Sequence, residues 1–200
     1  MSASKLQKTW VSVKAPMSFN QVDLPRVLAQ SNEAVLNRRI TVSLSDLTGD
    51  IRQIQVFLKF RIVDVEGGVA KTRFDQLELA REYVRGMVRR GTTKTEVITD
   101  VETRDGARLR VFTIVISKGK VHRSKRTAVR KAGSRILIEK ATNSSFDEFV
   151  QEIVLGKASA EIFSAARKIV SVNALEIRKV KVLSPPNTEQ ISQGTVENNQ

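Results

Sequence analysis

The stretch RQIQVFLKFRIV, residues 52–63, alternates apolar and polar side chains with a period of two. After Arg52, one face of this stretch is apolar: Ile54, Val56, Leu58, Phe60 and Ile62. Such a period is typical of a β-strand that packs one face on a core. Gly67-Gly68 predicts a tight turn, after which residues 69–74 return as the second strand of a hairpin. An antiparallel pair of strands is therefore expected over residues 52–74.

Helix and strand signals continue beyond this hairpin. Asp75, with Glu78 as its capping-box partner, predicts a helix that begins at Gln76. Asp105-Gly106 predicts the turn of a second hairpin, whose second strand is apolar on both faces and therefore central. Ser145 and Glu148 predict another capping box. The expected helices cover residues 76–90, 123–142, 145–155 and 158–170, and the further expected strands cover 95–104, 109–117 and 172–183.

These elements predict an α+β fold. We expect a mixed, largely antiparallel sheet, either open or curled toward a barrel, covered by about four helices. Residues 1–20 are expected to form a basic, irregular N-terminal arm, in which Trp10 anchors the chain to the core or to a partner. Residues 21–183 are expected to form one folded domain. The polar tail, residues 184–200, has little to bury and is expected to be disordered in isolation.

Composition excludes several classes of function. The chain of 200 residues has no cysteine, which excludes disulfides and thiolate metal sites and fits a reducing cytosol. No segment approaches the ~20 apolar residues of a membrane span, and the first residues lack the apolar core of a signal peptide. We therefore expect a cytoplasmic protein with no membrane partner.

Positive charge is the strongest functional signal. The chain has 34 Lys+Arg against 21 Asp+Glu, a formal net charge of +13. Residues 118–135 contain eight cations and no acid. A short basic run is often only a solvated helix face. In a chain this basic, however, Lys and Arg that neutralise phosphates and release counterions are the usual source of nucleic-acid affinity. We interpret the run as the contact surface for a nucleic-acid backbone.

Signals for catalysis are weak. His122 is the only histidine, so neither a zinc site nor a histidine-based acid–base pair can be built around it. Asp100, Glu102 and Asp105 could suggest a metal-dependent nuclease, but two-metal sites need carboxylates that converge from several elements. No Walker-type phosphate loop occurs. We expect no enzyme activity, no cofactor, no bound metal and no small-molecule substrate.

Two binding modules fit poorly. The helices on either side of Gly156 resemble a helix-turn-helix, but the second begins with Ala158-Ser159-Ala160-Glu161, where a recognition helix would read bases. Phe57 beside Lys59 and Arg61 has only a weak similarity to the aromatic strand of an RNA-recognition motif.

Short motifs spread along almost the whole chain resemble one family, the eukaryote-type S-one ribosomal proteins, formerly S-three-A-e. The motifs lie at residues 8–10, 15–19, 38–48, 72–74, 83–91, 103–106 and 176–183. Their order and spacing make the resemblance specific. The chain departs from the family pattern at Asn37, where glycine is common, and at Gln76 and Ser171-Val172.

The resemblance implies a structural component of the small ribosomal subunit that binds rRNA at the platform, near the mRNA exit and the rRNA 3′ end. It implies neighbouring platform proteins and mRNA as partners, and no catalysis. The lack of long extensions favours an archaeal source. Two alternatives stay open: a free DNA- or RNA-binding regulator, and more distantly a nuclease. The predicted RNA-binding residues are Lys118, Lys120, Arg123, Lys125, Arg126, Arg130, Lys131, Arg135, Arg85, Arg89, Arg90, Lys94, Arg38, Arg39, Lys8, Trp10 and Lys14.

Overall fold

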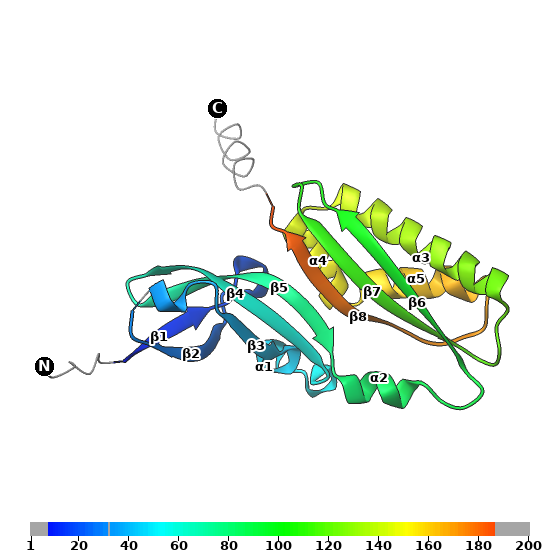
Figure 1. Cartoon of the computed structure of the whole chain (residues 1–200), viewed down its shortest axis with the longest axis horizontal. Coiled ribbons are helices and arrows are strands. Elements are labelled where there is room, and N and C mark those ends of the chain that lie inside the picture. The colour runs from blue at the N-terminus through cyan, green and yellow to red at the C-terminus, as the bar shows by residue number, and fades with distance from the viewer. Residues whose placement is uncertain (1–7, 32, 187–200) are drawn as a thin grey trace, which may run out of the picture. The chain divides into compact units, whose positions relative to one another are not determined.

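The computed structural model describes residues 8–31 and 33–186 (Figure 1). Contacts divide the chain into two compact units, Met1–Leu77 and Glu78–Gln200. Strands and helices form a mixed, mostly antiparallel α+β fold, so the predicted fold class is confirmed. The predicted domain limits, residues 21 and 183, stay a prediction. The predicted tail lies outside the described residues from position 187 onward.

The strands of the first unit pair in the order β2-β1-β5-β4-β3. Their bounds are β1 Thr9–Lys14, β2 Asp23–Ala29, β3 Arg39–Ser43, β4 Val56–Glu66 and β5 Val69–Leu79. β1 runs parallel to β5, whereas the β1–β2 and β3–β4 pairs are antiparallel. Since β2 and β3 stand at the two ends of this order, the described strands form an open sheet rather than a barrel.

Residues 9–14 are not an irregular arm, so that prediction was wrong. They form β1, which hydrogen-bonds to β2 on one side and to β5 on the other. Val11 and Val13 alternate into the core, 3% and 1% exposed. The alternation of apolar and polar residues covers only six positions, which is too short to indicate a strand in the sequence alone. Hydrogen bonding to β2 on one side and β5 on the other stabilises this segment as a strand.

The predicted strand at 52–63 is confirmed from Val56 onward. Leu58, Phe60 and Ile62 are fully buried, and the ring of Phe19 meets Phe60 edge-on at a centroid distance of 5.3 Å. The start is displaced because the Asp50 side chain accepts a hydrogen bond from the Arg52 amide and caps a short 3-10 turn, Ile51–Gln53. Ile54 is consequently exposed.

The chain before β3 explains one departure from the family pattern. Asn37 adopts φ 63°, in the left-handed region. Glycine enters that region without strain, and asparagine is one of the few other residues that tolerate it. The helix α1, Leu44–Thr48, follows β3 directly, and the Ser43 side chain caps it by accepting from the Asp46 amide.

The prediction of a helix over residues 76–90 is mostly wrong. Strand β5 continues through Leu79, and α2 covers only Arg81–Met87. Asp75 is not a helix cap, because its carboxylate binds Arg39 and Arg61 instead. Glu78 is accordingly not a capping-box residue, and its Oε1 lies 3.7 Å from Lys179 Nζ. Leu77 and Leu79 are buried, and their alternation was a strand signal that the capping motif masked.

Three antiparallel strands form the sheet of the second unit, in the order β6-β7-β8. They cover Thr93–Glu102, Arg108–Ser117 and Val172–Ser184. Gly106, at φ 73°, allows the tight turn between β6 and β7 that Asp105-Gly106 predicted. β7 is central, and its consecutive residues Ile114, Val115 and Ile116 are all buried, as predicted for a strand covered on both faces.

Helices α3 (Arg123–Asn143), α4 (Phe146–Val154) and α5 (Lys157–Arg167) lie together on one face of this sheet (Figure 1). α3 packs on β6 and α5 on β8. α3 packs closely on α5 and β6 at Gly133, where a Cβ would lie at ordinary van der Waals distances, 3.4 Å from Ile162 Cγ2 and 3.5 Å from Val97 Cγ1. The predicted capping box of Ser145 and Glu148 is present, and Gly156 separates α4 from α5 at φ 76°.

Candidate nucleic-acid interface

The basic run divides into a loop and a helix. Lys118 and Lys120 are exposed in the loop that follows β7. Thr93 anchors this loop: its hydroxyl donates to the Gly119 carbonyl at 2.8 Å and accepts from the Val121 amide at 3.1 Å. The loop therefore holds its two lysines next to the start of α3.

The cations of helix α3 differ in exposure according to the side of the helix on which they lie. Its buried stripe is Val129, Gly133, Leu137 and Ala141. Arg126 and Arg130 border this stripe and are only half-exposed. Arg130 Nε donates to the Glu96 carbonyl at 3.1 Å, and Arg126 Nε is buried without a hydrogen-bond partner in the described part of the chain. The exposed cations of α3 up to residue 135 are Arg123, Lys125, Lys131 and Arg135.

We call the exposed cations of the run the α3 cation surface: Lys118, Lys120, Arg123, Lys125, Lys131 and Arg135. In the described residues, none of these side chains makes an ion pair with a carboxylate. Glu139 is the only acid within α3. Lys131 and Arg135 also line a shallow depression with Ser134 and Ile138. This surface carries positive charge that the described structure leaves unneutralised.

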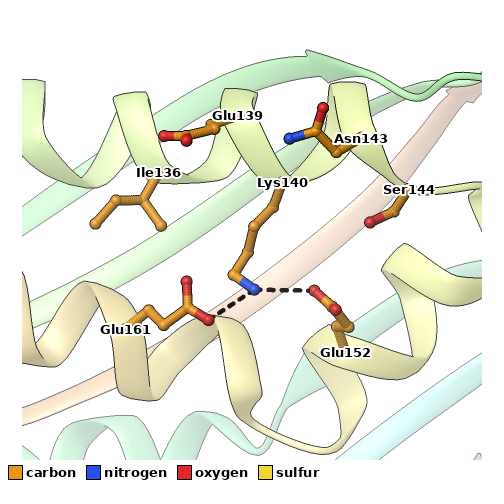
Figure 2. A pocket seen from close by; sticks show the side chains of 7 residues that line it. All are labelled: Ile136, Glu139, Lys140, Asn143, Ser144, Glu152 and Glu161. Atoms are coloured by element: carbon orange, nitrogen blue, oxygen red, sulfur yellow. Dashed lines mark hydrogen bonds and ion pairs between the residues drawn. The ribbon is translucent and has the colours of Figure 1, made fainter.

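The C-terminal half of α3 is different (Figure 2). Lys140 Nζ lies 3.1 Å from Glu152 of α4 and 2.8 Å from Glu161 of α5. The hydrogen bond to Glu161, ahead of the one to Glu152, raises the pKa of Lys140, although burial opposes the shift. Ile136 and Asn143 line the same pocket. Lys140 therefore links α3 to α4 and α5 through ion pairs, and its charge is not available to phosphate.

The predicted cations near α2 lie in three different places: on α2, in the turn after it and on β6. Arg85 is exposed on α2, while Arg89 and Arg90 are exposed in the turn that leads to β6. Lys94 binds Glu96 at 2.7 Å, which lowers the pKa of that carboxyl. Lys94 is thus already neutralised, whereas the three arginines pair with no carboxylate in the described part of the chain.

The predicted residues of the first unit have mixed surroundings. Trp10 is 65% exposed on β1, opposite Leu28 of β2, so it anchors nothing to the core. Lys8 and Lys14 are also exposed. Arg38 Nη1 donates to the Leu28 carbonyl at 3.3 Å, and Arg39 Nε pairs with Asp75 at 2.7 Å.

Two arginines near Arg39 were not among the predicted residues. Arg61 of β4 also contacts Asp75, at 3.0 Å, and Arg73 lies two residues before Asp75 on β5. Strand alternation would have placed Arg73 and Asp75 on one face if Asp75 had not been assigned to a helix cap.

The three carboxylates of the nuclease alternative do not converge. Asp100 accepts two hydrogen bonds from Arg110, at 2.6 and 2.7 Å, and this lowers the pKa of the carboxyl. Glu102 pairs with Arg108 at 3.3 Å. Asp105 accepts from the Phe146 amide at 2.8 Å and so holds the start of α4. Each acid has a structural partner, and no described group of acids or histidines could hold a metal ion.

No helix in the described ranges is both long enough and apolar enough to cross a membrane.

Comparisons with known proteins agree with the charge pattern. The family model described as the Ribosomal S3Ae family matches residues 3–186. The Small ribosomal subunit protein eS1 of Sulfurisphaera tokodaii is 42% identical over 90% of this chain and 93% of its own length. The protein of the same name from Saccharolobus solfataricus is also 42% identical, over 90% of this chain and 86% of its own. The chain therefore belongs to the Ribosomal S3Ae family, as a structural, non-enzymatic component of the small ribosomal subunit.

Proposed function

We propose that this protein binds rRNA at the platform of the small subunit, near the mRNA exit and the rRNA 3′ end, through the α3 cation surface. The observation that carries the proposal is the unneutralised charge at Lys118, Lys120, Arg123, Lys125, Lys131 and Arg135. Like charges held close together repel one another and lower stability unless a polyanion lies against them. For a member of a ribosomal protein family, the polyanion at hand is the phosphate backbone of rRNA.

The chemistry is phosphate neutralisation rather than base reading. RNA duplexes hide their base edges in a deep, narrow major groove, so proteins recognise them by shape and backbone. Flexible lysines act as point charges, whereas arginines bind two phosphate oxygens with a planar fork. The exposed side of α3 supplies both kinds, on a helix whose other side is fixed by Val129 and Leu137. Neighbouring platform proteins, and mRNA near the exit, are the further partners that we propose.

A free nucleic-acid-binding regulator is the second candidate. It would need its own base readout, and the most exposed helical cations would then be expected on a recognition helix. In the pair α4–α5, the first turn of α5 after Lys157 offers only a buried Ala158 and the short side chains of Ser159 and Ala160, so it lacks the long polar side chains that read bases. That observation favours the ribosomal role.

Sedimentation of a cell lysate separates the two candidates. The protein is expected to travel with small subunits in magnesium-containing gradients and to be nearly absent from the free fraction. It should leave the subunit as salt is raised, because phosphate contacts weaken steeply with salt. A dominant free or chromatin-bound pool at low salt would favour the regulator.

A further inference from the structure

The first unit contains a second concentration of positive charge, on the outward face of β3, β4 and β5. Arg39 and Arg61 are direct cross-strand partners in the β3–β4 register. Like charges in that relation destabilise a sheet. Asp75 of β5 relieves the conflict by binding both, with Arg39 Nε at 2.7 Å and Arg61 Nη2 at 3.0 Å.

One carboxylate does not neutralise this cluster. Arg73 lies two residues before Asp75 on β5 and so shares its face. Burial, and then the charge of Arg61, lower the pKa of Arg73, which means that the surroundings disfavour its charged form. We call the three guanidinium groups and the carboxylate the Arg39–Arg61–Arg73 cluster; its side chains carry three positive charges against one negative.

The cluster also has unused hydrogen-bonding capacity. Arg61 Nε is buried without a hydrogen-bond partner among the described residues. The Arg61 side chain is nevertheless 33% exposed and that of Arg39 51%, so both arginine side chains are partly open to solvent. Asp75, at 11%, is largely covered. An anion approaching from outside would therefore meet arginine donors before it met the carboxylate.

We infer that the Arg39–Arg61–Arg73 cluster binds a phosphate group of the RNA backbone, as a second RNA contact separate from the α3 cation surface. The inference rests on the proposed function for the nature of the anion. Arginine forks match the tetrahedral oxygens of phosphate, and their five donors explain how a guanidinium group already bound to Asp75 can also bind an anion. Arg61 and Arg73 are thereby assigned an RNA-binding role that the charge run did not suggest.

The test is Arg73→Gln in the full-length protein, measured on a platform rRNA fragment over a salt series. Losing one phosphate contact should reduce the slope of log K against log salt by about 0.9. The same change should leave the melting temperature of the free protein unchanged or higher, because it removes repulsion at Arg61. Opposite effects on binding and stability would support the site. An unchanged slope would overturn it.

Lys131→Gln is the matched control, since it removes one exposed charge from the α3 cation surface. A slope lost with Lys131→Gln but kept with Arg73→Gln refutes only the second site. A slope kept with Lys131→Gln but lost with Arg73→Gln refutes only the α3 surface. The two hypotheses therefore fail independently.

Asp75→Asn gives a result of the opposite sign. Removing the competing carboxylate should free both arginines and tighten RNA binding, provided that circular dichroism shows a folded variant. Weaker binding by a folded variant would contradict the site. If the variant does not fold, Arg73→Gln decides alone.

Polyglutamate and inorganic phosphate identify the anion. If Arg73→Gln weakens binding to RNA and leaves binding to polyglutamate unchanged, the RNA assignment stands. An equal loss with polyglutamate would assign the cluster to an acidic protein segment and overturn the RNA assignment. A loss with inorganic phosphate while RNA binding is kept would assign the cluster to a free anion and would also overturn it.

Discussion

The α3 cation surface and the outer face of the β6–β8 sheet are both rich in cations, but only one of them is neutralised. On the sheet face turned away from the helices, Lys94, Arg108, Arg110 and Arg178 each lie within 3.4 Å of a carboxylate oxygen. On α3, the exposed cations have no such partner among the described residues. Counting Lys and Arg would treat the two surfaces as equal.

The difference shows that net charge becomes a binding surface only where the fold leaves it unpaired. Asp100 and Glu102 of β6 face Arg110 and Arg108 directly across on β7, while Glu96 pairs with Lys94 of its own strand and with Arg178 of β8. Exposed surface pairs of this kind contribute little to stability. They do remove the positive potential that would attract a phosphate backbone.

The largest expected effect comes from Arg123, Lys131 and Arg135, changed together to Gln. If each contacts one phosphate, the salt slope on a platform rRNA fragment should fall by about 2.7, taking the duplex-DNA coefficient of about 0.9 per contact as a guide. This choice avoids Arg126 and Arg130, which are half-buried and contribute to packing. Circular dichroism should show an unchanged fold.

The matched control is Lys94, Arg108 and Arg110, changed together to Gln, which removes the same number of charges from paired positions. Its slope should fall much less. Equal losses for the two triple variants would break the comparison between paired and unpaired cations.

Trp10→Ala extends the comparison to an aromatic residue of the first unit. Stacking of an RNA base on an exposed aromatic ring contributes about 1–3 kcal/mol, and Trp10 is exposed beside Lys8. Affinity for a single-stranded platform fragment should fall by that amount, while Trp10→Phe should keep most of it. Because Trp10 is the only tryptophan, quenching of its fluorescence reports the contact directly. Binding without any quenching would exclude stacking.

Lys140→Met should affect stability but not RNA binding. The change leaves Glu152 and Glu161 facing each other without their cation, and a loss of about 1 kcal/mol is expected for this partly exposed network. Pairing raises the pKa of Lys140. The stabilisation is therefore present below the ordinary lysine pKa and is lost as pH rises through the raised value. Urea unfolding of both proteins at neutral and strongly alkaline pH measures this, and a reduced RNA affinity would show that this end of α3 also contacts RNA.

Asp100→Asn should have the smallest effect. It releases Arg110 on the sheet face, where we expect no RNA, so the salt slope should not change. Pairing lowers the pKa of Asp100, so its small stabilising contribution is present above the ordinary aspartate pKa and is lost as pH falls through the lowered value. Thermal unfolding from pH 7 down to about pH 2 tests this, over the range in which carboxylates titrate. A slope that rises by about 0.9 would place RNA on the sheet face after all.

The sequence by itself determined the local features of this protein. The Asp105-Gly106 turn, the capping box of Ser145 and Glu148, and the break at Gly156 all form as predicted. Each depends on hydrogen bonds or backbone angles within a few residues, so neighbouring positions contain the necessary information. The basic run and the spaced family motifs were equally visible, which is why the class of function could be predicted.

Only the tertiary structure decided what each charged side chain meets. Asp75 had the sequence context of a helix cap, yet arginines from two other strands hold it in β5. Arg126 and Lys131 looked equivalent in the basic run, but the packing of α3 on β6 turns one inward and the other outward. Helix packing and strand contacts neutralise Lys140 and Lys94. Strand register brings Arg39, Arg61 and Asp75 together. These contacts join residues far apart in the chain, and no local pattern of residues specifies them.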